Sequence, residues 1–482
     1  MKLIKDTFIY GGGDFVGRLI TFITFPIIAA VLSPKDYGSI ELIVTSIVLL
    51  GYIANSGLNN AVQRYYWDEL VSEKERPVIV STGLVTLTVF GLVLAGILLL
   101  ASPFLVSYLE SNNYSFGYIA VVSACMLIVL QQNNQYIIDV TRLHFAPYKY
   151  LVLTNLKKTG TALLGLLFVV YLDKGIDGYI GVQAATLIVL LPIGIYLIKR
   201  DITLEFDKKW FKKLVSFGYP FIFVSIAYWL FGSMDRWMLA ALSSVEETGI
   251  YSISFRFSGI ALFVSVAFGQ AWSPYAMKIK TDQPDNYKKI YTKVLYVLLL
   301  VMFLIGGGLA MLSGEILYLF MPSDYYASAL PMSILCFGIV FKSTQQVTAL
   351  GISLEEKTYW FARIAWITAG FNLIANWFLI PPLGALGAAI ATAVSYLLIT
   401  VLYLYYTQQL HPLPLSKMKL LILLSLGCVL LWISIKYLHV GFDPYVVAVK
   451  LIGLVVIISV TFFMLNLKLN LNFSKIFKKN DQ

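Results

Sequence analysis

The sequence predicts an all-α integral membrane protein with about fourteen transmembrane helices, and three observations lead to this fold class. Of the 482 residues, 59% are apolar and only 13% are charged, whereas soluble proteins carry about 25% charged residues. The mean hydropathy is +0.79, and long apolar runs recur along the whole chain with short polar connections between them. Since lipid offers no partner to an open backbone group, each run of roughly 20 apolar residues is predicted to cross the membrane as a helix.

These apolar runs define the predicted elements in chain order. They cover residues 8–32, 39–62, 78–101, 117–138, 150–171, 178–198, 215–238, 250–272, 290–312, 329–353, 359–380, 384–407, 420–437 and 445–466. The first run follows Lys2 and Lys5 as in a secretory signal, but it is too long for one, so we expect it to remain as a helix.

The runs predict four parts of the chain. Residues 1–198 are expected to form an N-terminal six-helix lobe, and residues 199–214 a cytoplasmic linker. Residues 215–407 are expected to form a C-terminal six-helix lobe. Residues 408–482 then supply helices thirteen and fourteen and a cytoplasmic tail.

The distribution of Lys and Arg predicts the orientation. If the N-terminus is inside, the cytoplasmic connections hold most of these residues and the outer loops hold only Lys35 and Lys174. Short cytoplasmic loops carry such an excess, so both termini are predicted to be cytoplasmic. The same asymmetry accounts for the net charge of +10, so we expect contact with anionic membrane lipids and no nucleic-acid partner.

Metal, redox and nucleotide chemistry have no support in the sequence. The cysteines and histidines are Cys125, Cys336, Cys428, His144, His411 and His439. The cysteines fall inside apolar runs and the histidines in separate predicted loops, so no metal site or His-based catalytic group is expected. The connections are too short for a nucleotide-binding domain, and no phosphate-binding glycine motif is present, so ATP hydrolysis is excluded and no cofactor is expected.

Weak similarity between the halves predicts an internal repeat. The segment 32–40 matches 242–250, and 178–186 matches 384–392, at offsets near 206 to 211 residues. Two related six-helix units follow, with the same orientation and an axis along the membrane normal.

The first helix of each predicted unit carries residues that interrupt helices. These are Gly11, Gly12, Gly13 and Pro26 in the first unit, and Gly218 and Pro220 in the second. Paired interruptions at corresponding positions favour bent helices beside a transport cavity. Ordinary packing is the alternative, because Gly and Pro are frequent in membrane helices.

Basic residues inside the predicted spans are the candidate binding site. Six of them are Arg18, Arg256, Lys342, Arg363, Lys157 and Lys158. A charge inside the membrane costs about 2.5–3.5 kcal/mol, so such residues usually face water or a partner. Guanidinium and ammonium groups bind phosphate oxygens well, so the excess positive charge suits a phosphate or pyrophosphate headgroup. Lys436 and Lys450, near the predicted outer surface, are expected to snorkel.

Acidic residues within the spans are few, chiefly Asp14, Glu41 and Asp235. Asp14 precedes Arg18 by one helical turn, so a structural ion pair is the alternative to a binding role for Arg18. Asp235 and Arg236 are adjacent, and we expect them to point to different faces of their helix.

Several short motifs carry a family resemblance. They are Ser216-Phe217-Gly218-Tyr219-Pro220, Met234-Asp235-Arg236 and Gly249-Ile250-Tyr251, with Phe25-Pro26 and Tyr37-Gly38 in the first half. With the order of the spans, they resemble the polysaccharide transporters, or lipid-linked oligosaccharide flippases, of the multidrug/oligosaccharidyl-lipid/polysaccharide exporter superfamily.

The resemblance implies a V-shaped pair of six-helix lobes in the bacterial cytoplasmic membrane. Such proteins carry an undecaprenyl-pyrophosphate-linked oligosaccharide from the inner to the outer leaflet by alternating access. The product serves O-antigen, capsule or exopolysaccharide synthesis, which implies a polysaccharide polymerase as a partner. No covalent chemistry is required, so the chain is not expected to be an enzyme.

The resemblance also implies roles for individual residues. In the similar peptidoglycan-precursor flippase, arginines on the first and eighth helices bind the pyrophosphate, and Arg18 and Arg256 occupy those helices here. Coupling to H⁺ or Na⁺ would involve Asp14, Glu41 or Asp235.

Two other functions remain open from the sequence. A cation-coupled multidrug exporter of the same superfamily would be expected to present carboxylates to its drugs, and the basic excess argues against it. A membrane-embedded polysaccharide polymerase or ligase usually carries a large outer loop, and the longest outer loop here, about residues 313–328, is short.

Overall fold

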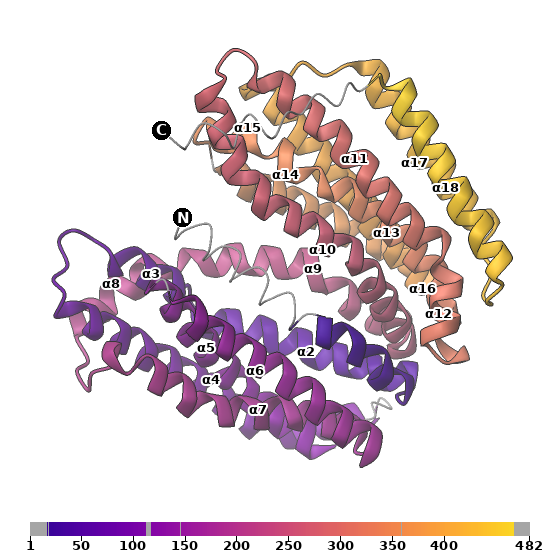
Figure 1. The fold of residues 1–482 in the computed structure, drawn as a ribbon. Helices are drawn as coiled ribbons and strands as arrows, with labels where there is room; N and C mark the ends of the chain where they lie inside the picture. The colour runs from indigo at the N-terminus through magenta and orange to yellow at the C-terminus, as the bar shows by residue number, and fades with distance from the viewer. Residues whose placement is uncertain (1–16, 18, 112–116, 145, 358, 467–482) are drawn as a thin grey trace. The chain divides into compact units, whose positions relative to one another are not determined.

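The computed structural model describes residues 17, 19–111, 117–144, 146–357 and 359–466, and this part of the chain is helical with no strand (Figure 1). Within it, ten helices are long and apolar enough to cross a membrane, or eleven if one bent pair counts as a single span. The chain is therefore a multi-pass, all-α membrane protein, as predicted. The number fourteen stays a prediction.

The helices follow the predicted spans in order. After a short apolar helix, Leu19–Ala30, come α2 (Pro34–Asn55), α3 (Leu58–Tyr66), α4 (Glu75–Ser111), α5 (Tyr118–Leu143), α6 (Pro147–Gly165) with the π-helix η1 (Leu166–Tyr171), α7 (Gly175–Leu197), the 3₁₀ turn η2 (Lys199–Asp201), α8 (Lys208–Gly218) and α9 (Pro220–Leu242). The second half has α10 (Val245–Asp282), α11 (Tyr287–Met311), α12 (Ser313–Phe320), η3 (Ser323–Ser328), α13 (Ala329–Ser343), α14 (Gln345–Thr348), α15 (Leu350–Leu354), α16 (Tyr359–Leu410), α17 (Lys417–Lys436) and α18 (Pro444–Met464).

The described residues group into two compact units. Unit 1 contains the chain up to Ile253 together with Leu317–Ser328 and Ala365–Ala391; unit 2 contains Ser254–Ile316, Ala329–Ile364 and the chain from Thr392. Since α10 and α16 each contribute to both units, these groups do not follow chain order. The division into lobes at residues 198 and 407 stays a prediction.

In unit 1, α5 packs against α2, α4 and α7, and α3 packs against α4 and α8. Apolar side chains form most of this core, but buried tyrosines also contribute hydrogen bonds. Tyr136 on α5, for example, donates to the Val80 carbonyl on α4 (2.8 Å). Such a bond satisfies a hydroxyl that would otherwise be costly to bury.

In unit 2, α11 is the central helix and contacts α13, α17 and α18. The last two helices are thus packed on the rest of the unit. Ser333 on α13 donates to Ser434 on α17 (3.0 Å), and this pair is buried.

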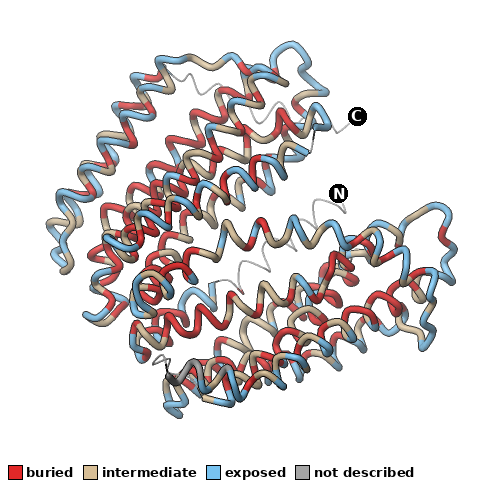
Figure 2. The backbone as a smooth tube through the Cα atoms, turned by 180° about the vertical axis from the view of Figure 1, so that it is seen from behind, coloured by how far each residue is buried: buried red, intermediate tan, exposed pale blue. Residues whose placement is uncertain are grey.

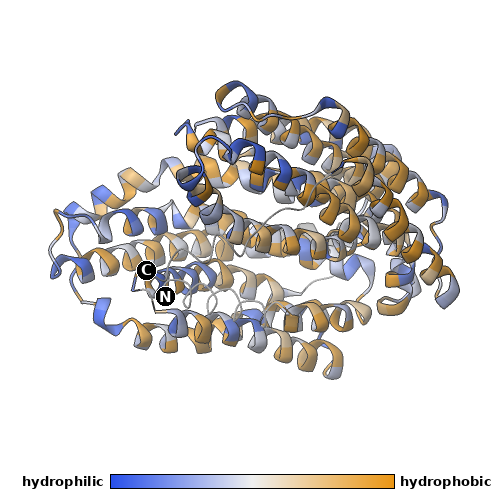
Figure 3. Ribbon diagram, turned by 45° about the horizontal axis from the view of Figure 1, so that its top comes forward, coloured by the Kyte–Doolittle hydropathy of each residue, from blue (hydrophilic) through white to orange (hydrophobic). Residues whose placement is uncertain are grey.

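Polarity along the helices agrees with a membrane location. Hydrophilic residues concentrate at helix ends and in loops, whereas the long middle parts of the helices are hydrophobic (Figure 3). Buried and exposed residues alternate along the helices of each unit (Figure 2). Many exposed side chains are large and apolar, as expected where lipid is the solvent.

One predicted boundary between spans is a kink. The 52-residue helix α16 contains Pro381 and Pro382, and Gly384 has a non-helical backbone with φ 55°. Positive φ is accessible to glycine at little cost. The Glu247 carboxylate accepts a hydrogen bond from the Ala385 amide just beyond the kink (2.6 Å), so the freed backbone is satisfied.

Candidate functional site

Two equivalent glycines of the predicted repeat meet in unit 1. Gly38 lies in the first turns of α2, and Gly249 lies in the first turns of α10. A Cβ atom on Gly38 would overlap the Val245 carbonyl oxygen, and a Cβ on Gly249 would overlap the Pro34 carbonyl oxygen. Only glycine permits this approach of α2 to α10, and it brings the residues that follow on both helices together.

A buried charge cluster lies beside this contact. Arg236 on α9 has its Nε 3.4 Å from Glu41 Oε2 on α2, and its Nη1 donates to Asp235 Oδ1 (3.0 Å). Tyr251 on α10 donates to the other oxygen of Asp235. We call Glu41, Asp235, Arg236 and Tyr251 the charge cluster.

The charge cluster is almost closed to solvent. Glu41, Asp235 and Arg236 are 6%, 3% and 5% exposed. Both carboxylates therefore contact the Arg236 guanidinium in a setting of low dielectric. The attraction to a buried cation offsets part of the cost of removing the two carboxylates from water.

Tryptophans on α9 fix the position of the cluster relative to α2. Trp229 donates from its indole to the Thr45 carbonyl (2.8 Å), and Trp237 donates to the Thr45 hydroxyl (3.1 Å). The Thr45 hydroxyl in turn donates to the Glu41 carbonyl (2.8 Å). With the hydrogen bond from Tyr251, polar contacts in one small region thus join α2, α9 and α10.

The expectation that Asp235 and Arg236 point apart is wrong. The guanidinium folds back along α9, where Nη1 donates to the Gly232 carbonyl (3.0 Å) as well as to Asp235. Arginine is long enough to reach its own neighbour, and burial makes an unpaired charge more costly than a folded side chain. Two predicted carboxylates, Glu41 and Asp235, consequently share one partner.

Several predicted residues lie outside the described part of the chain, namely Gly11, Gly12, Gly13, Asp14 and Arg18. Lys157 and Lys158 are half-buried on α6. A Cβ on Gly17 would lie 2.7 Å from the Cδ of Lys158. Lys158 therefore packs against the position that precedes Arg18 in the sequence.

The other predicted basic residues lie in unit 2. The Lys342 ammonium on α13 is 4.3 Å from the ring centroid of Tyr396 on α16, at cation–π distance. Arg256 is half-buried on α10. Arg363 is exposed near the start of α16, with its guanidinium 5.1 Å from the Trp360 ring.

The predicted interruption of the seventh span coincides with a bend. Helix α8 ends at Gly218 and α9 begins at Pro220, with 40° between them. A Cβ on Gly218 would lie 2.5 Å from the Ser56 carbonyl oxygen, at the junction of α2 and α3. Two helix breaks therefore touch, whereas Pro26 is buried within the helix Leu19–Ala30.

Lys450 does not snorkel, contrary to expectation. It is buried on α18 and its ammonium pairs with Glu315 on α12 and donates to the Met311 carbonyl (3.0 Å). The carboxylate comes from a segment that looked like an outer loop, 135 residues away. Lys436, in contrast, is exposed and lies over the Trp432 ring.

Sequence reasoning also missed two clusters built on histidines. In unit 1, Asp201 Oδ2 lies 2.8 Å from His144 Nε2, and Asp201 Oδ1 accepts from the Tyr66 hydroxyl (3.1 Å). We call Tyr66, His144 and Asp201 the first clasp, which joins the ends of α3, α5 and η2.

In unit 2, His411 Nδ1 lies 3.0 Å from Glu355 Oε1, and His411 Nε2 lies 3.0 Å from the Tyr287 hydroxyl. We call Tyr287, Glu355 and His411 the second clasp, which joins the start of α11 to the ends of α15 and α16. His144 and Glu355 are 211 residues apart, and Asp201 and His411 are 210 apart. The offset of the internal repeat was therefore the signal that could have found them.

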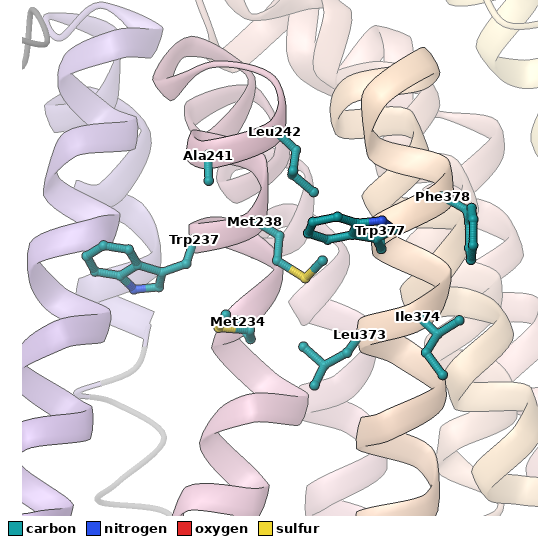
Figure 4. Close-up of a pocket in the computed structure, with 9 residues that line it drawn as sticks. All are labelled: Met234, Trp237, Met238, Ala241, Leu242, Leu373, Ile374, Trp377 and Phe378. Atoms are coloured by element: carbon teal, nitrogen blue, oxygen red, sulfur yellow. The ribbon is translucent and has the colours of Figure 1, made fainter.

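A groove of about 470 Å³ runs between α9 and α16 within unit 1 (Figure 4). Its walls include Met234, Trp237, Met238, Leu373, Ile374 and Trp377. Figure 4 shows Met238 of α9 facing Trp377 of α16. The lining is apolar or aromatic throughout, so the groove offers no charge to a headgroup.

Comparison with known proteins agrees with this architecture. The fold is that of the multi-pass helical transporters of the MOP superfamily. A structure described as the lipid II flippase MurJ, inward closed conformation, has a TM-score of 0.72 at 14% identity, with 95% of this chain and 97% of that chain covered. A structure described as the inward-facing conformation of a multidrug resistance MATE family transporter of the MOP superfamily has a TM-score of 0.57 at 12% identity, over 84% and 94% of the two chains.

Family models match both halves of the chain. The polysaccharide biosynthesis protein model matches residues 3–280, and the MatE model matches residues 220–378. Because the first match covers more than half of the sequence, the chain belongs to the polysaccharide biosynthesis protein family.

The individual relatives are distant in sequence, and two of the three matches extend over most of this chain. A probable low-salt glycan biosynthesis flippase, Agl15 of Haloferax volcanii, is 23% identical over 82% of this chain and 81% of its own length. A probable flippase of the same organism, AglR, is 27% identical over 35% of this chain and 36% of its own. The Lsg locus putative protein 1 of Haemophilus influenzae is 20% identical over 62% of this chain and 72% of its own.

Proposed function

We propose that this protein is a flippase for a lipid-linked glycan, and that its substrate is an undecaprenyl-pyrophosphate-linked oligosaccharide. The substrate would move from the inner to the outer leaflet of the bacterial cytoplasmic membrane by alternating access, with both termini of the chain in the cytoplasm. The family match over residues 3–280 carries the proposal, and the flippase names of the relatives support it. The product would supply O-antigen, capsule or exopolysaccharide synthesis and would pass to a polysaccharide polymerase.

The basic residues within the helices suit such a substrate. We propose Arg18, Arg256, Lys342, Arg363, Lys157 and Lys158 as its pyrophosphate-binding set. Charge-assisted hydrogen bonds to phosphate are about twice as strong as neutral ones and strengthen away from water. The lipid tail can stay in the bilayer while these groups replace the water of the headgroup, so no covalent bond has to change.

The charge cluster provides a means of coupling. Because Glu41 on α2 and Asp235 on α9 both contact the Arg236 guanidinium, uptake of H⁺ or Na⁺ at either carboxylate would alter the attraction between α2 and α9. A carrier changes state only if a ligand favours one state over the other, and a shared cation provides that difference. Asp14 is the third proposed coupling residue.

Bending at Gly218 and Pro220 would accompany this change. The two helix breaks in contact there, at Ser56-Gly57 and Gly218, have short or absent side chains and would absorb backbone rotation. Gly11, Gly12, Gly13 and Pro26 are the proposed counterparts in the first helix.

Reconstitution tests the proposal. The purified protein is placed in vesicles that carry a labelled polyprenyl-pyrophosphate oligosaccharide, and exposure of the label in the opposite leaflet is measured. We expect Arg18→Ala and Arg256→Ala each to slow transport by about 10- to 100-fold, the value of one charge-assisted hydrogen bond. Lys436→Ala is the matched control, since Lys436 is exposed beside Trp432, and it should transport at the wild-type rate.

A cation-coupled multidrug exporter is the second candidate, and the MatE match over residues 220–378 favours it. The same vesicles distinguish the two. Efflux of a cationic dye with no movement of the labelled lipid would replace the flippase proposal. Lipid transport at the wild-type rate in both arginine variants would retain the flippase but remove Arg18 and Arg256 from the binding set.

A further inference from the structure

The linker between α7 and α9 contains a helix with two different faces. Trp210, Leu214 and Gly218 are buried at a spacing of four residues in α8, which packs on α3 and α4. On the opposite side, Lys208, Lys209, Lys212 and Lys213 are all exposed. At 100° per residue these four lysines occupy one continuous arc of the helix.

Exposed apolar side chains precede this basic face. Leu204 is fully exposed and Phe206 is 47% exposed. The segment that carries them is held in place, because the Thr203 amide donates to Ser81 Oγ (2.8 Å) and the Asp207 amide donates to Thr82 Oγ1 (3.2 Å) at the start of α4. The exposed apolar side chains are therefore presented by an ordered turn.

We propose that the exposed face of α8, with Leu204 and Phe206, binds the anionic phospholipid headgroups of the leaflet on which the linker lies. Lysines on an amphipathic helix are attracted to the negative surface of a membrane. Leu204 and Phe206 gain by leaving water for the acyl boundary, which a soluble acidic partner would not provide in the same way. The helix thus fixes the linker to the membrane surface.

The position of α8 in the chain supports a bilayer as the occupant. It is preceded by α7, which is long and apolar enough to cross a membrane, and it joins α9 at a 40° bend, so that α8 and α9 together are long and apolar enough for one bent span. Because four lysines of α8 are exposed, we place this end of the bent pair at the level of the headgroups. Since α9 carries the charge cluster, the bend at Gly218 connects the lipid-bound surface directly to it.

The lysines to test are those whose charge is not already engaged by a nearby acidic residue. Lys213 interacts with Glu75 at the start of α4 and lies over the Trp210 ring at 4.5 Å. Lys208 follows the capping residue Asp207. Lys209 and Lys212 lie at the centre of the basic arc, so their charges are the ones most available to lipid.

The experiment uses a label on the same face. Ser216 is exposed among the lysines, and in a Cys428→Ser background Ser216→Cys accepts a fluorophore, because the other cysteines, Cys125 and Cys336, are buried. The full chain is reconstituted in phosphatidylcholine vesicles, with or without phosphatidylglycerol. Quenching by lipids with a spin label near the headgroup measures docking.

We expect strong quenching only with phosphatidylglycerol, and loss of it in about 1 M salt, where the screening length falls to roughly 3 Å. K209Q/K212Q should reduce the ratio of docked to undocked helix about 25-fold, at about fivefold per lysine. The matched control K278Q/K289Q removes two exposed lysines of the next basic connection and should leave quenching unchanged.

Two results would overturn the proposal. Quenching that is equal with and without phosphatidylglycerol would mean that apolar contact alone places the helix. A label that stays in water in both kinds of vesicle would show that the basic face does not bind lipid, and an acidic protein would then be the better candidate for its ligand. The measurement reads the linker alone, so its failure leaves the proposed transport function untouched.

Discussion

The two clasps are equivalent acid–histidine contacts in which the positions of the acid and the histidine are exchanged. Where the first clasp has His144 the second has Glu355, and where the first has Asp201 the second has His411. Each pair is completed by a tyrosine hydroxyl. The acid and the base of each clasp lie at helix ends that the internal repeat makes equivalent, whereas the tyrosines come from α3 and α11, which are not counterparts. What is retained between the two halves is therefore the contact between acid and base, not the residue type at each position.

The clasps differ in which partner is buried. In the first clasp the carboxylate side chain is 8% exposed and the imidazole 36% exposed. In the second the imidazole is 6% exposed and the carboxylate 40% exposed. A buried carboxylate must keep its partners, whereas a buried imidazole can become neutral. The first clasp should therefore be the more sensitive to loss of its exposed partner.

The largest effect is expected from His144→Ala. Among the residues that the structure describes, it leaves the buried Asp201 carboxylate with the Tyr66 hydroxyl as its hydrogen-bond partner, and an incompletely compensated buried charge costs about 3 kcal/mol. Glu355→Ala in the second clasp removes an exposed carboxylate and leaves His411 in contact with Tyr287, so we expect a clearly smaller loss of stability. Thermal unfolding of the two variants in detergent measures the difference.

Lys436→Ala is the control for general effects of a substitution on stability in detergent, since the Lys436 side chain is exposed at the end of α17. Equal destabilisation by His144→Ala and Glu355→Ala would contradict the argument from burial. A larger loss in Glu355→Ala would reverse it.

A smaller effect is expected when the first clasp is given the order of the second. In H144D/D201H the acid moves to the end of α5 and the base to η2, as at Glu355 and His411. We expect the double variant to unfold within about 1 kcal/mol of the native protein, while each single substitution costs about 2 kcal/mol or more. Double-mutant-cycle measurements check this, and additive losses would show that the positions are not interchangeable.

Prediction from the sequence succeeded where the signal was local. Apolar length identified the helices, and Gly218 and Pro220 marked a bend that the structure contains. The rarity of acids in the spans singled out Glu41 and Asp235, which lie in one cluster. Whether Arg256 and Lys342 bind a headgroup stays a prediction.

Contacts between residues that are far apart in the chain were not predicted from the sequence. Lys450 looked like a snorkelling residue because its partner, Glu315, lies in a segment that was expected to be an outer loop. The histidines looked isolated because their partners are 56 to 124 residues away. Such pairs depend on how helix ends meet, which composition and periodicity do not encode.

The smallest effect is a difference in pH dependence between the clasps. The hydrogen bond from His411 lowers the pKa of Glu355, with Lys280 and Lys357 adding to it. A group whose pKa is lowered in the folded state contributes stability above the ordinary glutamate value of about 4.3, and this contribution is lost as the pH falls through the lowered pKa.

In the first clasp, burial and then the Asp201 charge raise the pKa of Tyr66. That contribution is present below about pH 10 and is lost as the pH rises further. We therefore expect Glu355→Gln to flatten only the acid side, and Tyr66→Phe only the alkaline side, of a plot of unfolding temperature against pH. A variant that flattened the opposite side would mean that the two clasps do not titrate independently.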